Sequence, residues 1–109
     1  MSRVLELSSL EWQAVRPQVA RQVFGKTLRD DKVKAVLTRV APEGRFEVHS
    51  DPYAHLFYFL GGEGRVWIGN EQFATHAGVV VQIDAGEEHA YENTGSADLM
   101  LLSLNIPVA

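Results

Sequence analysis

The chain has 109 residues, of which 46% are hydrophobic and 22% are charged, and this composition indicates one globular domain with a real core rather than a disordered or collagen-like chain. Fourteen acidic against 10 basic residues give a formal net charge of −4, and no cluster of Lys and Arg stands out, so nucleic acid is not expected as a partner. The absence of cysteine excludes disulfides and thiolate sites, which leaves histidines and carboxylates as metal ligands.

The N-terminal segment has no apolar core of the kind that a secretion signal carries, and no stretch approaches the length of a membrane span. The sequence therefore predicts a cytoplasmic protein without a membrane partner. Residues 8–16, SSLEWQAVR, predict one short helical turn, because Ser8 and Glu11 have the spacing of a capping box and Pro17 prevents a longer helix.

Short apolar segments separated by Gly, Pro, Asn, Asp and Ser fill the rest of the chain at intervals typical of a β-sandwich or barrel. Gly69-Asn70 between two such segments predicts a two-residue hairpin, and hence antiparallel neighbours. The fold class is therefore predicted as all-β. The predicted strands cover residues 19–26, 32–41, 45–49, 55–60, 64–68, 71–75, 79–83, 90–93 and 99–105.

Several of these strands are apolar on both faces, as in HLFYFL, VVVQI and LMLLSL. One face can fill the interior of a barrel, but the other face needs a second sheet or a second subunit. The sequence therefore predicts a homodimer.

Three of the four histidines lie where strand parity brings them toward one another. His49 and Asp51 are two residues apart and share a face, and a short turn can return the chain so that His55 lies beside them. His89 follows a tight turn and is the fourth candidate to converge. A cluster of imidazoles inside an apolar barrel needs hydrogen-bond partners or a metal to offset desolvation, so these residues predict a divalent metal site.

These residues resemble the cupins, whose two motifs are written G-x5-H-x-H-x(3,4)-E-x6-G and G-x5-P-x-G-x2-H-x3-N. The first motif is assigned to residues 44–64, with Gly44, His49 and Gly62, and the second to residues 78–93, with Gly78, Gly86, His89 and Asn93. The resemblance implies a single cupin domain over residues 1–109, with a double-stranded β-helix or jelly-roll barrel and a short N-terminal helical turn.

The chain departs from these motifs at three positions. Asp51 replaces the second histidine, His55 replaces the glutamate, and Asp84 replaces a proline in a turn. Histidine in place of the glutamate resembles a subset of small cupins with four-histidine metal sites, some of them manganese proteins linked to oxidative chemistry. The resemblance implies one divalent transition metal per chain, Fe or Mn first and Zn or Ni as alternatives. The implied ligands are His49, Asp51, His55 and His89.

Each candidate also has an ordinary structural interpretation. His49 and His89 fit as histidines with ordinary partners, His55 as the start of a strand at the rim, and Asp51 as a turn residue before Pro52 whose carboxylate bonds backbone N–H groups. His76 is expected to be a solvent-facing turn residue. Four further residues, Phe57, Tyr91, Arg39 and Met100, are candidate contacts to a substrate, although a barrel core also needs large apolar residues. No catalytic residue is assigned.

Three functions fit these features, and each takes a small-molecule ligand. The first is an iron- or manganese-dependent oxygenase or oxidase, supported by the two-histidine, one-carboxylate pattern of His49, Asp51 and His89. The second is a zinc- or nickel-dependent isomerase or lyase acting on a sugar or a small acid. The third is a binding or sensing module without catalysis, since a fold does not imply a function.

Overall fold

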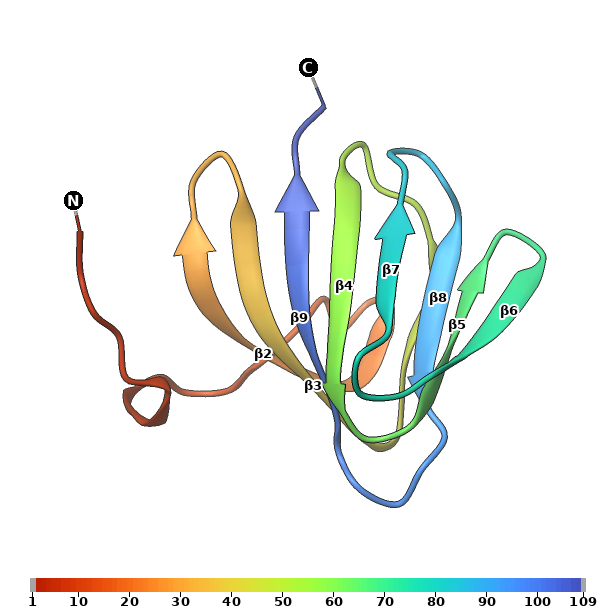
Figure 1. Cartoon of the computed structure of the whole chain (residues 1–109), viewed down its shortest axis with the longest axis horizontal. Helices are drawn as coiled ribbons and strands as arrows, with labels where there is room; N and C mark the ends of the chain where they lie inside the picture. The colour runs from red at the N-terminus through yellow and green to blue at the C-terminus, as the bar shows by residue number, and fades with distance from the viewer. Residues whose placement is uncertain (1, 109) are drawn as a thin grey trace.

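The computed structural model describes residues 2–108, which form one nine-stranded antiparallel sheet that curls into a half-barrel (Figure 1). This architecture confirms the predicted all-β class. The described elements are η1 (Leu7–Ser9), β1 (Gln13–Ala14), β2 (Ala20–Asp30), β3 (Lys34–His49), β4 (Ala54–Gly61), β5 (Gly64–Ile68), β6 (Glu71–Thr75), β7 (Val80–Ile83), β8 (His89–Asn93) and β9 (Leu99–Ile106).

The strands follow the order β6-β5-β8-β3-β9-β4-β7, and β2 pairs with β3 outside this path. Sequence neighbours are therefore often not spatial neighbours, as a jelly roll requires. The predicted hairpin is confirmed, because Ile68 pairs with Glu71 across Gly69-Asn70. Gly69 has φ +58, a conformation that favours glycine in such a turn. Within residues 2–108 no helix is long and apolar enough to cross a membrane.

The predicted turn between residues 41 and 45 is wrong, because β3 runs without interruption through this segment. The strand bends there instead: its first half pairs with β9 up to Val40, and its second half pairs with β8 from Arg45 onward. Glu43 has φ +70 at the bend. Pro and Gly thus mark a change of pairing partner, not the end of a strand, which is a known role of these residues in curled sheets.

The assignment of the first motif also needs a correction at this bend. Counting back from His49 by the family spacing gives Glu43, and Glu43 is the residue with the positive φ. Gly44 is needed for a different reason. A Cβ at Gly44 would lie 2.7 Å from the carbonyl oxygen of Ala41 and 2.8 Å from that of Gln22, so only glycine allows this close approach.

The predicted short helical turn near the N-terminus is confirmed, but its bounds and its cap differ from the prediction. A 3-10 turn begins at Leu7, and no side chain caps it, so Ser8 and Glu11 do not form a capping box. The residues that follow are extended, and Gln13 and Ala14 add a short strand to β2. Free backbone groups on the edge of β2 favour this pairing over a helix that Pro17 would stop.

The core lies between the two halves of the curled sheet. It contains the inward side chains of alternating strand residues, and the completely buried ones include Val40, Phe59, Val66, Leu99 and Leu101. Alternate residues of β4 behave as parity predicts: His55, Phe57 and Phe59 are buried, whereas Tyr58 and Leu60 are exposed. The predicted homodimer, which would cover such outward residues, stays a prediction.

Candidate metal centre

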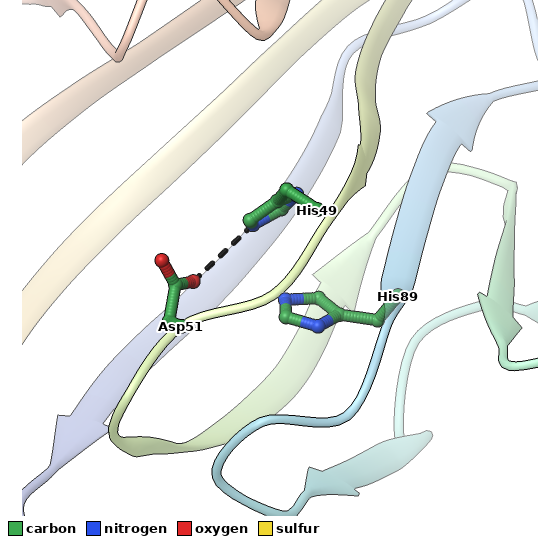
Figure 2. Close-up of side chains that lie close together, drawn as sticks. All are labelled: His49, Asp51 and His89. Atoms are coloured by element: carbon green, nitrogen blue, oxygen red, sulfur yellow. Dashed lines mark ion pairs between the residues drawn. The ribbon is translucent and has the colours of Figure 1, made fainter.

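Two neighbouring strands place His49 and His89 side by side. His49 ends β3 and His89 begins β8, and the two residues are paired in register, with ring centroids 4.3 Å apart. Asp51 follows β3, and its backbone carbonyl accepts a hydrogen bond of 2.7 Å from the N–H of Gly86 in the loop before β8. This bond connects the segments of the two sequence motifs and fixes the position of Asp51. Figure 2 shows the three side chains directed toward one another.

His55 approaches the same cluster from β4. Its Nε2 lies 2.9 Å from Oδ2 of Asp51, and its ring centroid lies 4.8 Å from that of His89. In register, His55 is opposite Asn105 of β9. The curled sheet therefore brings residues from β3, β4 and β8 to one end of its interior.

The hydrogen bonds of the three histidines determine which ring nitrogen is available. His49 and His89 each direct Nδ1 at a backbone carbonyl, which can only accept, so their Nδ1 carries the proton and their Nε2 presents a lone pair. His55 lies between the side-chain amide of Asn105 and the carboxylate of Asp51, and its Nε2 donates to Asp51. The acceptors are the Glu47 carbonyl for His49 (2.7 Å) and the Glu87 carbonyl for His89 (2.9 Å), and Nδ1 of His55 lies 3.0 Å from the side-chain amide of Asn105.

The carboxylate of Asp51 lies between these side chains. Its Oδ2 lies 3.3 Å from Nε2 of His49 and 2.9 Å from Nε2 of His55. Among the described residues, Nε2 of His89 is buried without any hydrogen-bond partner. Acceptors that face acceptors in a buried site require a cation between them, either a proton or a metal ion.

The charge of Asp51 is maintained despite its burial. Desolvation alone would raise the pKa of this carboxyl, but hydrogen bonds from His55 and Arg16 outweigh it, so the pKa lies below its ordinary value. Burial lowers the pKa of His89 to about 4, with a smaller opposing contribution from its bond to Glu87. At neutral pH the site therefore contains a carboxylate and a neutral imidazole, which are the forms that bind metals.

Arg16 holds the other oxygen of the carboxylate. Its Nη1 lies 3.0 Å from Oδ1 of Asp51, while Oδ2 faces the histidines. The carbonyl of Arg16 accepts hydrogen bonds from the N–H groups of Val19 and Ala20, which fixes the turn before β2. The side chain thus reaches from the N-terminal segment to the cluster and orients Asp51.

The side chains present fit a transition-metal ion. His49, Asp51 and His89 each offer a ligand atom, and these atoms all lie within 4.8 Å of one another. Two imidazoles and one carboxylate suit first-row metals such as iron, manganese, nickel and zinc. The unpartnered Nε2 of His89 is the atom that such an ion would satisfy. His55 lies outside this group and contacts it through Asp51.

A cavity of about 510 Å³ opens onto the cluster. The N-terminal segment forms one wall with Leu10, Val15 and Arg16, and the inner faces of β2, β3, β4, β8 and β9 form the others. Its volume lies within the range of about 300–1,000 Å³ that is typical of small-molecule pockets.

The four proposed substrate contacts lie on two different faces. Phe57 and Tyr91 line the cavity next to the histidines. Arg39 and Met100, paired in register on β3 and β9, are on the outward side, and neither lines the cavity. The guanidinium of Arg39 lies over the ring of Trp12, 4.9 Å from its centroid. His76 is exposed, as the sequence predicts.

Sequence reasoning missed Arg16 and Asn105. Arg16 is 35 residues from its partner Asp51, and nothing in its neighbourhood indicates the contact. Asn105 left a weak signal, because Ser103 and Asn105 are polar residues at inward positions of an otherwise apolar strand. Such a pattern indicates a polar contact inside a barrel.

Comparison with known proteins places the chain in one family. A family model described as a cupin domain matches residues 36–105. An oxalate-binding protein from Thermotoga maritima is 38% identical over 64 residues, a match that covers 59% of this chain and 46% of the relative. The match thus spans less than half the length of that relative.

Solved structures agree with this result at the level of the fold. A predicted oxalate decarboxylase from Thermotoga maritima has a TM-score of 0.89 at 23% identity, over 97% of this chain and 100% of that one. A polyketide cyclase from Streptomyces resistomycificus has a TM-score of 0.88 at 19% identity, over 96% of this chain and 79% of that one. At these identities the likeness confirms the jelly-roll barrel and carries no activity over to this chain.

Proposed function

This chain belongs to the cupin family, and we propose that it is a metal-dependent oxidoreductase that acts on a small organic acid bound in its cavity. One arrangement carries the proposal: ligand atoms of His49, Asp51 and His89 converge at the inner end of a cavity with room for a ligand. His49, Asp51 and His89 would hold an iron or manganese ion. Such an ion supplies redox chemistry and Lewis acidity when it is bound.

The protein residues around this site have separate roles in the proposal. Glu47 and Glu87 fix the orientation of His49 and His89 by accepting their Nδ1 protons, and the amide of Asn105 holds the ring of His55 by a hydrogen bond to its Nδ1. Arg16 binds Oδ1 of Asp51 and so directs Oδ2 at the histidines. The rings of Phe46 and Phe57 lie against His49 and His55 and exclude water, which strengthens electrostatic interactions inside the cavity.

The organic acid is supported by charge and by similarity. Arg16 and Lys34 line the cavity and offer cationic donors to an anion, although Glu11 and Asp51 in the same lining balance their charge. The Thermotoga maritima relative is named as an oxalate-binding protein, which also makes binding without catalysis the second candidate function. The two candidates share the metal site and differ in whether dioxygen is consumed.

Elemental analysis of protein purified without an affinity tag tests the metal site. We expect about one equivalent of iron or manganese per chain, and His89→Gln should lose most of it. His76→Gln is the matched control, because His76 is an exposed histidine away from the cavity. Protein that takes up no transition metal after reconstitution would refute the proposal.

Dioxygen consumption by the iron- or manganese-loaded protein separates the two candidate functions. A set of small organic acids, including oxalate, should contain at least one that stimulates consumption above the level of the His89→Gln variant. If acids bind and none stimulates consumption, the protein is a binding module.

A further inference from the structure

Resting on the proposed function, we propose that the natural ligand is a carboxylic acid with a ring-sized body that carries a hydroxyl group, and not a small diacid such as oxalate. The first argument is volume. At roughly 30 Å³ per water molecule, a cavity of about 510 Å³ holds the equivalent of about 17 waters. Oxalate would fill a small fraction of this space and leave apolar surface in contact with water.

The apolar part of the cavity fits a ring. Phe46, Phe57, Val36 and Val15 line it together with the buried ring of Tyr91. Phe46 and Phe57 each lie 5.4 Å from Tyr91 between ring centroids, with interplanar angles of 52° and 75°, so the three rings are contiguous and are tilted against one another. Such a wall offers ring edges and faces to an aromatic ligand, which packs edge-to-face or offset. An acid without such a body would gain nothing from this wall.

A pair of hydroxyl groups interrupts the apolar surface. Thr38 of β3 and Ser103 of β9 form a hydrogen bond of 3.0 Å, and both line the cavity. Ser103 is opposite Phe57 in register, so the pair lies next to the aromatic surface. In such a pair one hydroxyl donates to the other, which leaves one proton and several lone pairs for a ligand. This arrangement recognises a hydroxyl group on the ligand body.

Arg16 provides the binding site for the carboxylate. A guanidinium has five N–H donors, and Arg16 uses Nη1 for Asp51, which leaves donors for a second carboxylate. The side chain is 39% exposed and lines the cavity at its metal end. An acid bound there has its body directed along the aromatic surface.

Titration calorimetry with manganese-loaded protein under argon tests this assignment, with oxalate, benzoate and the three monohydroxybenzoates as probes. We expect at least one hydroxybenzoate to bind about tenfold more tightly than oxalate and about fivefold more tightly than benzoate, the gain of one hydrogen bond. Ser103→Ala should remove the difference between this hydroxybenzoate and benzoate and leave benzoate unchanged.

Two arginine variants test the carboxylate site. Arg16→Gln should lower the affinity for every carboxylate ligand about tenfold or more. Arg16→Lys should restore part of this loss. Metal content is measured in parallel, because Arg16 also holds Asp51. Arg39→Gln is the matched control on the outward face and should leave the affinity for each acid unchanged.

The outcomes distinguish the ligand class from the proposed function. Oxalate binding as tightly as the hydroxybenzoates, or hydroxybenzoate binding that is insensitive to Ser103, would overturn the ligand class and leave the metal site intact. If the protein takes up no metal, the proposed function fails. The metal-free protein then decides: Ser103-dependent binding of a hydroxybenzoate supports the ligand class, and its absence overturns it.

Discussion

The two ends of the barrel interior are built by the same strands and have opposite chemistry. Along β4 the inward residues are His55, Phe57 and Phe59, which lie in turn beside Asp51, in the cavity wall and in the core. Along β9 they change from Leu99 and Leu101 to polar residues at the cavity. The closed end is apolar and tightly packed, and the open end holds a buried carboxylate, three imidazoles and the unpartnered Nε2 of His89. The difference indicates that apolar burial in the core stabilises the fold enough to offset the cost of burying polar groups at the site.

The largest expected effect is at the closed end. Phe59 is completely buried, so Phe59→Ala should lower the free energy of unfolding by about 3–5 kcal/mol through lost burial and a cavity. Its neighbour Leu60 is 44% exposed, and Leu60→Ala should change stability by about 0.5 kcal/mol or less. Denaturant unfolding of both variants measures the difference. Equal effects would show that the closed end is not the source of stability.

Lowering the pH should decrease the free energy of unfolding of the metal-free protein, because of titratable groups at the open end. The pKa of His89 is lowered to about 4 in the folded protein from 6.5, so between these values the unfolded chain binds a proton that the folded chain excludes. The free energy of unfolding therefore falls as pH falls from about 6.5 to about 4, by up to about 3 kcal/mol. Asp51 acts in the same direction at lower pH, because its pKa is lowered and its stabilising bonds are lost on protonation.

Thermal unfolding of the metal-free protein as a function of pH measures this dependence. His89→Gln should flatten the profile between pH 6.5 and about 4, whereas His76→Gln should keep the wild-type slope. A wild-type profile that is already flat in this range would contradict the burial of a neutral His89.

Asp51→Asn tests whether Asp51 is a metal ligand or only a turn residue. The amide keeps the shape of the side chain, and the backbone carbonyl still accepts from Gly86, so the turn should persist. Loss of the charge should weaken metal binding about 100-fold, or about 2.7 kcal/mol. Competition with a chelator measures the affinity. Unchanged affinity would mean that Asp51 only stabilises the turn.

A substitution on the outer face is expected to change the stability of the single chain least. Tyr58 is exposed and lies beside Val80 in register, and the predicted homodimer would cover both. Wild-type protein should sediment as a dimer at micromolar concentration, and Tyr58→Lys should sediment as a monomer while changing the stability of the chain by about 0.5 kcal/mol or less. A monomeric wild type would contradict the prediction.

Local sequence patterns determined most of the strands and the direction of their side chains. The strand at residues 64–68 and the one at 71–75 were predicted with the bounds that the structure has, because Gly-Asn and the apolar segments define them locally. Parity alone indicated that His55 and Phe57 share a face, since side chains alternate along any strand. The two histidines of the motifs were identified by spacing in the same way.

Tertiary structure decided what depends on contacts between distant segments. The bend of β3 at Glu43 arises because the strand exchanges β9 for β8 as its partner, and Pro and Gly there look like a turn in the sequence. Pairing of Gln13 and Ala14 with an open strand edge limits the helical turn to Leu7–Ser9, short of its predicted end at residue 16. The bonds of Arg16 to Asp51 and of Asn105 to His55 join residues that are 35 and 50 positions apart. Local sequence patterns do not predict such contacts, because the curling of the sheet creates them.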